Sequence, residues 1–165
     1  MYQLKLEPLN LESFHEFGTF ADMLSPSGIQ SGQTPAIFWP DKVVANFHLQ
    51  DRVAFGVSEV SDRPKVVAAM EIHEHTCEII MPLNSDVALF VGPPMRIVNA
   101  TDENCHAFRI PKGTMVCLRP GTLHCSCYTL NAETALVLIG LPELNYRTDL
   151  ILIQLEDDKK FEIVI

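Results

Sequence analysis

Apolar residues in this chain fall into short runs, cut by turn residues at intervals of about ten positions. Regular short strands separated by Pro, Gly and Asn favour a sandwich or barrel over alternating strands and helices. We therefore predict an all-β fold, with VALFV and TALVLIGL as core strands. The runs are MYQLKLEPL (1–9), VAFGVSEV (53–60), VVAAMEIH (66–73), EIIMPL (78–83), VALFVG (87–92), PPMRIV (93–98), AFRI (107–110), TMVCL (114–118), LHCSCYTL (123–130), TALVLIGL (134–141), LILIQLE (150–156) and FEIVI (161–165).

One short helix is expected near the N-terminus, in the segment NLESFHEFG. Asn10 can cap it, because an Asn side chain accepts a hydrogen bond from a free backbone N–H of the first turn. Leu11, Phe14 and Phe17 share one face at helical spacing. Gly18 can end the helix, since glycine closes many helices in the left-handed conformation.

A loop is expected over residues 25–35, SPSGIQSGQTP, which is rich in Ser, Gly and Pro. Such a segment can act as a mobile flap over a site. It is too short to link two domains, so we predict one domain over residues 1–165.

The composition is that of a globular protein. The chain has 165 residues, 47% of them hydrophobic and 20% charged, which suffices to bury about two thirds of the unfolded surface. The net charge of −9 comes from 21 acidic and 12 basic residues spread along the chain. Without clustered Lys and Arg, nucleic acid is not an expected partner. We find no signal peptide and no apolar run of about 18–20 residues, so we expect a cytoplasmic protein that does not bind membranes.

The five cysteines lack the even number and the spacing of a secreted disulfide framework. They fit a reducing compartment, where a free Cys often serves as a small buried hydrophobe. Cys125 and Cys127 form a C-x-C pair with no second pair, which is a weak zinc pattern, and we expect both to be structural.

The first cluster of candidate ligands lies in EIHEHTCEIIMPL, where His73, His75 and Glu78 stand at the mouth of a strand. Side chains alternate along a strand, so His73 and His75 point to the same face. Glu78 has the opposite parity and joins them only if the chain bends or bulges at Thr76 and Cys77. We expect that bend, because Glu78 opens the next apolar run.

A second cluster lies in KGTMVCLRPGTLHCSCY. A short strand follows Gly113, the residues Arg-Pro-Gly make a tight turn, and His124 opens the next strand. Two strands thus offer His side chains beside turns. We interpret Arg109 and Arg119 as solvated charges at strand ends. For Arg119, which lies in the turn next to His124, the alternative is a contact with a substrate carboxylate.

The two clusters together resemble the sequence motifs of the cupin superfamily, whose jelly-roll barrels often hold a divalent metal on three His and one Glu. PGTLH matches the second motif well. The first motif is compressed, because only two residues separate His75 from Glu78, and Val67 stands where the family has Gly. The resemblance implies an all-β, cupin-type jelly-roll β-barrel with one short N-terminal helix.

A narrower resemblance, to the ureidoglycolate lyase (ureidoglycolate hydrolase) family, covers nearly the whole chain. It rests on LEPLNLESFHEFGTF, on VSEVSDRPKVVAAMEIH followed by EIIMPL, and on GTLHCS. The residues kept in the family's positions are Glu71, His73, Pro82, Gly121 and His124. The departures surround the expected pocket: Ile72 stands for Arg, Glu78 for Gln, Leu123 for Trp, Cys125 for His, and Glu59 for Arg.

These resemblances imply a metal held by His73, His75, Glu78 and His124, with catalytic roles for Glu71, Glu78 and His124. Glu71 serves as a base or orients a ligand. The metal is a divalent Ni, Zn, Mn or Fe ion, because such ligands do not separate these metals. The implied activity is that of an amidine-type C–N lyase, which cleaves ureidoglycolate to glyoxylate and urea in purine degradation.

The resemblance also implies a homodimer that pairs through edge strands. The apolar C-terminal segment FEIVI would suit such an edge. It would equally suit an internal strand, and the sequence leaves this open.

Other assignments also stay open. A single His on a strand is usually a packed or exposed residue, and we interpret His15, His48 and His106 in this way. The histidines of the two motifs could line a metal-free polar pocket instead of a metal site. The chain would then be a cupin-type protein that binds or senses a small molecule without turnover. A third alternative is a metal-dependent cupin enzyme with a different small-acid substrate.

Overall fold

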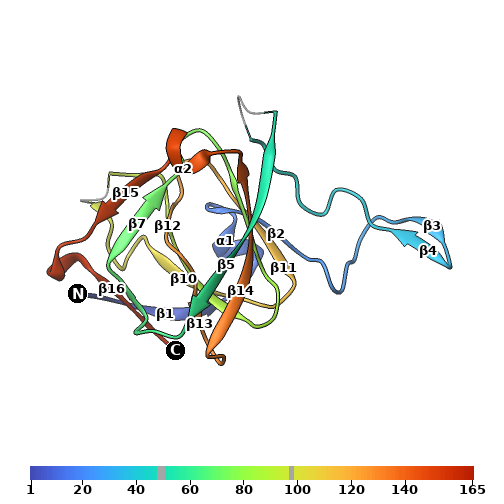
Figure 1. The fold of residues 1–165 in the computed structure, drawn as a ribbon. Coiled ribbons are helices and arrows are strands. Elements are labelled where there is room, and N and C mark those ends of the chain that lie inside the picture. The colour runs from blue at the N-terminus through green and yellow to red at the C-terminus, as the bar shows by residue number, and fades with distance from the viewer. Residues whose placement is uncertain (48–50, 97–98) are drawn as a thin grey trace.

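The computed structural model of the protein describes residues 1–47, 51–96 and 99–165. The described residues form two β-sheets that pack face to face as a curled barrel, with a long arm that projects from one side (Figure 1). The predicted all-β barrel class, with one short helix near the N-terminus, is thereby confirmed. None of the described helices is long and apolar enough to cross a membrane.

The larger sheet contains nine strands among the described residues. Most neighbours are antiparallel, while β1 runs parallel to both β10 and β16. In order across the sheet the strands are β15 (Ile151–Gln154), β7 (Ala69–Ile72), β12 (Leu123–His124), β9 (Val87–Gly92), β10 (His106–Ile110), β1 (Tyr2–Pro8), β16 (Phe161–Val164) and β6 (Val66–Val67), and β13 (Tyr128–Thr129) also pairs with β9.

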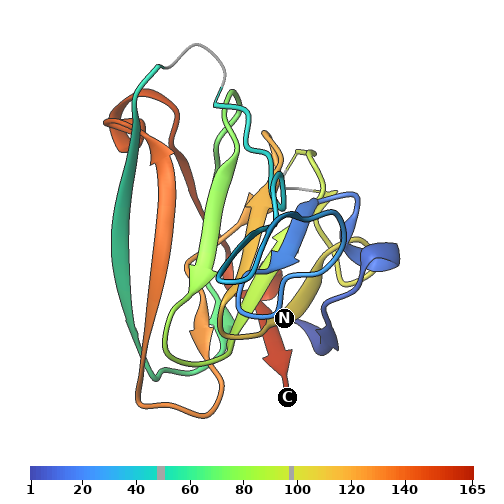
Figure 2. The same cartoon turned by 90° about the vertical axis from the view of Figure 1, so that its right-hand side faces the viewer.

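The smaller sheet is antiparallel and has five strands in the described part of the chain. Its long β5–β14 pair forms one side of the molecule in Figure 2. Its order is β2 (Gly18–Asp22), β11 (Thr114–Leu118), β8 (Glu78–Pro82), β14 (Thr134–Pro142) and β5 (Val53–Ser61).

The remaining elements are short. β3 (Ser31–Gln33) and β4 (Ala36–Phe38) form a separate hairpin in the projecting arm (Figure 1). The helices are α1 (Leu11–Phe14), α2 (Asn145–Thr148) and the 3-10 turn η2 (Asp157–Lys159).

The main core lies between the two sheets, and β9 shows how the sequence builds it. All six residues of β9 are buried. Val87, Leu89 and Val91 point into the core between the sheets, while Ala88 and Phe90 point to a second apolar cluster on the outer face. A strand that is covered on both faces has no solvent side, which explains its uninterrupted apolar sequence.

The predicted N-terminal helix exists but is shorter than expected. Asn10 caps it as predicted, since its side-chain oxygen accepts from the backbone N–H of Ser13 at 3.0 Å. The helix ends at Phe14, and Leu11 is 71% exposed. Gly18 instead begins β2, where a Cβ atom would lie 2.1 Å from the carbonyl oxygen of Cys117. The glycine therefore permits two strands to approach closely rather than ending the helix.

Several strand boundaries differ from the predictions. Residues 93–96 form no strand, and residues 97–98 of the same predicted run lie outside the described residues. The run 123–130 is broken at 125–127 into β12 and β13. The predicted loop 25–35 contains β3 and belongs to the arm, which extends away from the barrel (Figure 1). The C-terminal run forms β16, an internal strand between β1 and β6.

Candidate metal centre

The two predicted motifs meet where β7 and β12 end and β8 begins. Glu71 of β7 is paired in register with His124 of β12. Between the two motifs, the backbone N–H of Gly121 donates to the carbonyl of His73 at 2.7 Å. Gly121 has φ +81°, a conformation that favours glycine. The turn before His124 thus ties the second motif directly to the first.

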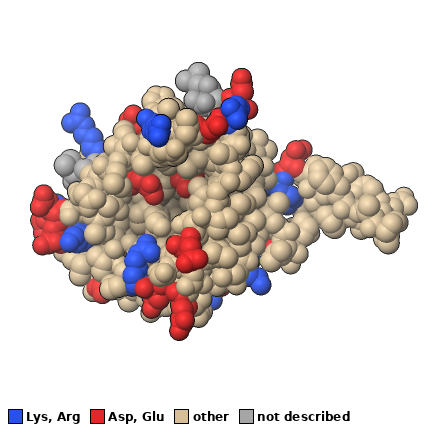
Figure 3. Space-filling model, viewed as in Figure 1, with Lys and Arg blue, Asp and Glu red and all other residues tan. Residues whose placement is uncertain are grey.

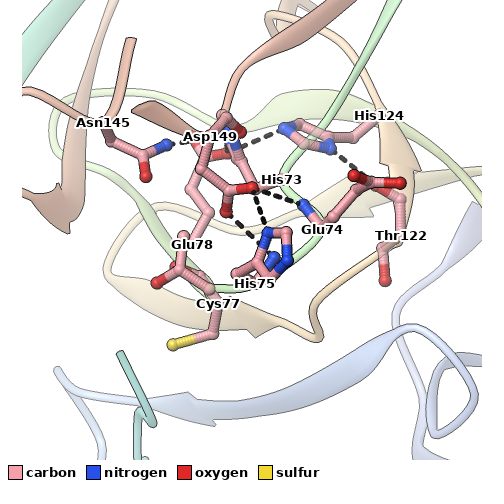
Figure 4. A network of polar contacts seen from close by, with 10 residues as sticks. His73, Glu74, His75, Cys77, Glu78, Thr122, His124, Asn145 and Asp149 are labelled. Carbon is pink, nitrogen blue, oxygen red and sulfur yellow. Dashed lines mark hydrogen bonds and ion pairs between the residues drawn. The ribbon is translucent and has the colours of Figure 1, made fainter. Parts of the chain in front are cut away.

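One carboxylate joins the two buried histidines. Oε2 of Glu78 lies 3.3 Å from Nε2 of His73 and 2.7 Å from Nε2 of His124 (Figure 4). All three residues are buried. Glu78 has the parity opposite to His73 along the chain, and it reaches the cluster because the chain bends between the two strands, at Glu74 and His75. A bend was predicted, and it lies two residues earlier than expected.

Both histidines are oriented by their other ring nitrogen. Nδ1 of His73 lies 2.8 Å from the carbonyl oxygen of Asp149, and Nδ1 of His124 lies 2.9 Å from that of Thr122. A carbonyl only accepts, so each Nδ1 carries a hydrogen and donates it. Nε2 of each neutral ring is then left with a lone pair that faces Glu78. This is the pattern of metal-ligating histidines, whose outer N–H is fixed by a backbone carbonyl or a carboxylate.

The side chain of Asn145 adds a second contact to His73, with Nδ2 at 2.9 Å from Nδ1. Because Nδ1 of His73 already carries a hydrogen, it cannot accept a hydrogen bond from the Asn145 amide N–H. Turning the amide by 180° brings Oδ1, which is buried without a partner among the described residues, against the Nδ1–H group. His73 would then donate to two oxygens, which fixes the plane of its ring.

The charges at the centre depend on one another. Burial raises the pKa of Glu78, but the charge of His124 and the close contacts with both imidazoles outweigh it and lower the pKa to about 2. Burial lowers the pKa of His124, but the carboxylates of Glu78 and Glu71 outweigh it and raise the pKa to about 9. The pKa of His73 is also raised, against burial, mainly by Glu78. The centre therefore requires positive charge next to Glu78.

A divalent cation fits this requirement. Oε2 of Glu78 and Nε2 of His124 are buried and lack an aligned hydrogen bond to any described residue, although they are only 2.7 Å apart. Two buried ligand atoms that lie this close without a hydrogen bond between them suit a bound ion. Imidazole nitrogens and carboxylate oxygens are suitable ligands for a divalent transition metal.

Glu71 belongs to the same cluster. One ligand atom each of Glu71, His73 and His124 lie within 4.8 Å of one another. Glu71 lies on β7 two residues before His73, which directly follows the end of that strand, and both side chains line the same cavity. The sequence assigned Glu71 the role of base or ligand orienter, and its position suits either a base or a further ligand.

The structure does not bring His75 to the cluster. β7 ends at Ile72, so the strand alternation that placed His75 beside His73 no longer applies after the bend. The side chain of His75 is 67% exposed, and its Nδ1 lies 2.9 Å from Oδ1 of Asp149. The predicted three-His set is therefore replaced by two His and two Glu side chains.

Asp149 and Asn145, which the sequence analysis did not single out, hold the first motif in place. Besides binding His73 and His75, Asp149 accepts from the backbone N–H groups of Glu74 and His75 at 3.1 and 3.0 Å (Figure 4). Both residues come from the segment around α2, more than seventy residues further along the chain. No local pattern marks them, because their role depends on a tertiary contact.

The centre lines a cavity of about 310 Å³ between the sheets. Figure 3 shows a hollow on the corresponding face, with acidic side chains inside it. The walls are mainly apolar, and the polar groups gather at the centre. The lining residues are Ser58, Val60, Glu71, His73, Glu78, Ile80, His124, Cys125, Ser126, Cys127, Val137, Ile139, Leu141, Tyr146 and Leu150.

The other singled-out residues lie elsewhere. His15 is exposed, and His106 contacts Glu7 at 2.8 Å. His48 lies outside the described residues. Arg109 pairs with an acidic side chain at the surface, and Arg119 donates to a backbone carbonyl rather than entering the cavity. All five cysteines are buried and free, as expected for structural residues.

The chain matches no protein-family model and no curated protein. Among solved structures, it is similar to oxalate decarboxylase from Bacillus subtilis, with 16% identity over 62% of this chain and a TM-score of 0.42. It is also similar to RmlC from Streptococcus suis, with 11% identity over 72% of this chain and a TM-score of 0.41. The chain spans 24% of the oxalate decarboxylase chain and 64% of the RmlC chain.

Proposed function

We propose that this protein is a cupin-type metalloenzyme in which His73, His124 and Glu78 hold a divalent cation, with Glu71 beside it. One observation carries the proposal: the Glu78 carboxylate lies between two Nε2 atoms whose rings are both fixed through Nδ1. A Ni, Zn, Mn or Fe ion suits this set of ligands.

The chemistry that suits the cavity is acid-base cleavage of a small hydroxy acid, and we propose a C–N lyase acting on ureidoglycolate or a related ureido acid. The metal, when bound, supplies a Lewis acid that polarises the substrate oxygens. Glu71 then takes the proton of the substrate hydroxyl. The hydroxyl oxygen forms the aldehyde C=O of glyoxylate, the C–N bond breaks with its electron pair moving to nitrogen, and Glu71 returns its proton to that nitrogen to give urea.

The apolar walls support this chemistry. Val60, Ile80 and Val137 are buried and line the cavity together with the polar groups. A cavity with such walls holds little competing water, and electrostatic effects on a developing charge are stronger there than in water.

A second candidate is a cupin-type protein that binds or senses a small molecule without turnover. It is favoured by the cavity lining, which includes neither Lys nor Arg among the described residues. An enzyme for a substrate as polar as ureidoglycolate needs a group to hold the carboxylate, and within this cavity only the metal can do so.

Metal content tests the proposed centre, which the enzyme requires and a metal-free binding protein does not. The purified protein should bind about one transition metal per chain, measured by elemental analysis after incubation with Ni, Zn, Mn or Fe(II). The His73→Ala/His124→Ala double variant should bind none. Equal metal content in the two proteins, or none in either, would contradict the proposed centre.

Urea release separates enzyme from binding protein. The metal-loaded protein should release urea from ureidoglycolate above the spontaneous rate, and Glu71→Gln should lower that rate by about 10²–10⁴-fold while keeping the metal. A metal-loaded protein that releases no urea above the spontaneous rate would exclude this substrate and favour the binding protein.

A further inference from the structure

A second cavity adjoins the metal centre. It measures about 300 Å³ and shares Glu71, Cys125 and Ser126 with the first cavity. Its other lining residues are mostly apolar, with one arginine among them: Arg63, Val66, Ala68, Ala69, Met70, Tyr128 and Leu152. The two cavities are therefore neighbours, and Glu71 of the metal centre lines both of them.

Arg63 is held in a fixed position at this second cavity. Its Nη2 donates to the carbonyl oxygens of Ser126 at 3.3 Å and of Cys127 at 3.0 Å. The guanidinium carbon lies 4.3 Å from the ring centroid of Tyr128, whose hydroxyl in turn donates to the carbonyl of Val66 at 2.8 Å. An arginine with two backbone acceptors and an aromatic ring beneath it has lost most of its freedom before any ligand arrives.

Arg63 is also without a carboxylate. Among the described residues it forms no ion pair, whereas Arg52 and Arg109 each lie 2.9 Å from an acidic side chain. The side chain is exposed, and the contacts that hold it are the carbonyls of Ser126 and Cys127 and the ring of Tyr128, none of which neutralises its charge. In a chain with 21 acidic residues against 12 basic ones, an oriented and unpaired guanidinium lining a cavity is poised to bind an anion.

We propose that Arg63 binds the carboxylate of the ligand, and that the ligand runs from Arg63 across the second cavity to the metal centre. The apolar residues Val66, Met70 and Leu152 suit a short aliphatic segment. Glu71 sets the direction, because its negative charge at the shared wall disfavours a second carboxylate there. The ligand class is a monocarboxylic acid with a short aliphatic chain and a polar, uncharged group at its other end.

This inference deepens the proposed function, and only its statement about the polar end rests on the metal centre. The anion site itself depends on Arg63 and the second cavity. It also gives the substrate carboxylate a partner that the first cavity lacks, so substrates longer than ureidoglycolate would fit both cavities.

Binding of hexanoate, which has the carboxylate and the aliphatic chain of this class without the polar end, tests the anion site. Isothermal titration calorimetry on metal-free protein should show saturable binding of hexanoate, weakened about tenfold or more in Arg63→Gln. Arg109→Gln, which removes an exposed arginine on another part of the surface, is the matched control and should bind as the unmodified protein does. Hexan-1-ol, which has the chain without the charge, should bind equally to Arg63→Gln and to the unmodified protein.

A variant without the metal ligands distinguishes a failure of the anion site from a failure of the metal centre. The His73→Ala/His124→Ala variant should still bind hexanoate, whether or not the unmodified protein holds a metal. Because Arg63→Gln could loosen the 125–127 segment, its melting temperature is measured alongside. If that variant does not fold, the Nε–H resonance of Arg63 in the unmodified protein serves instead, and it should shift on titration with hexanoate. No hexanoate binding, equal binding by a folded Arg63→Gln, or an unshifted Nε–H resonance would overturn the proposal.

Discussion

At the scale of single residues, Glu78 is the group on which the centre depends. A carboxylate that is only 7% exposed carries a large desolvation cost, and it stays ionised because two imidazoles meet it. A bound cation would fill the same role with a higher charge. We therefore propose that Glu78 is a ligand when metal is bound and the partner of His124 when it is not.

Glu78→Gln should abolish most metal binding. Changing a group that merely supports a ligand often costs about 10–100-fold in metal affinity, so removing a ligand should cost at least that much. Glu74→Gln, an exposed change nearby in the same segment, is the control and should leave the affinity unchanged. Metal titration followed by competition with a chelator measures both, and equal affinities in the two variants would contradict the assignment of Glu78.

The metal-free protein should be most stable at mildly acidic pH. The folded pKa of Glu78, about 2, lies below its ordinary 4.5, so its contribution is present above pH 4.5 and is lost as the pH falls toward 2. The folded pKa of His124, about 9, lies above its ordinary 6.5, so its contribution is present below pH 6.5 and is lost as the pH rises through 9. The two pKa shifts report the same interaction between Glu78 and His124, so their contributions to the free energy of unfolding are not added.

Thermal unfolding of chelator-treated protein at pH 3, 5.5 and 9.5 checks this dependence. The melting temperature should be highest at pH 5.5 and lower by roughly 5 °C on each side. Glu78→Gln should remove most of the decline between pH 5.5 and 9.5. A decline of the same size in this variant would show that other groups cause it.

At the scale of elements, the segment between β7 and β8 is shaped by a distant anchor. The Asp149 carboxylate accepts from two successive backbone N–H groups, and its carbonyl accepts from His73. These contacts hold the bend that turns His75 outward and lets Glu78 enter the cavity. The ligand set is thus decided by the conformation of the segment as much as by its residues.

His75→Ala should retain the full metal content, whereas Asp149→Ala should weaken metal binding about tenfold. The imidazole of His75 is exposed and its loss leaves the bend in place, while loss of the Asp149 carboxylate releases two backbone N–H groups beside His73. Elemental analysis and metal titration of both variants test this. Loss of the metal in His75→Ala would restore the original three-His assignment.

The close approach of β2 to β11 at Gly18 gives a second prediction at the scale of elements. Gly18→Ala places a Cβ atom 2.1 Å from a backbone oxygen of β11 and should destabilise the fold by about 1–3 kcal/mol. Gly56→Ala on β5 has nothing within 4 Å of the new atom and is the matched control. It should be neutral or stabilising by about 0.4–1 kcal/mol. Urea denaturation midpoints of the two variants should therefore move in different directions or by clearly different amounts.

At the scale of the whole molecule, one edge of the smaller sheet is apolar and uncovered. β5 is the outer strand, and Phe55 and Val57 are 63% and 59% exposed. The arm that carries β3 and β4 also exposes apolar side chains, Ile29 and Phe38 among them. A two-stranded hairpin is marginal in water unless it packs against something. The homodimer implied by the family resemblance would cover these surfaces.

We expect a homodimer in solution, with β5 in the interface. Phe55→Asp/Val57→Asp should convert it to a monomer, because two charges would be buried at the contact. Leu11→Asp, at an exposed apolar position away from this edge, should leave the mass unchanged. Sedimentation equilibrium gives the mass of each of the three proteins in solution. An unmodified protein with the mass of a monomer would contradict the expected homodimer.

Much of the architecture follows from local pattern. The unbroken apolar sequence of β9 predicts burial on both faces, and Asn10 predicts the start of α1. The run 123–130 shows the limit of such reasoning. It has the sequence of one strand, but the carbonyls of Ser126 and Cys127 accept from Arg63, about sixty residues earlier in the chain, and the strand is broken there.

The sequence by itself determined that two histidine motifs lie beside turns at the ends of short strands in an all-β fold, because residue types, turn signals and strand alternation are local properties. Only the tertiary structure decided which side chains meet. Glu71 replaces His75 at the centre because the strand ends at Ile72, and Asp149 and Arg63 act through contacts across the chain. Alternation predicts the direction of a side chain only while the strand continues, and bends are set by partners that lie far away in the sequence.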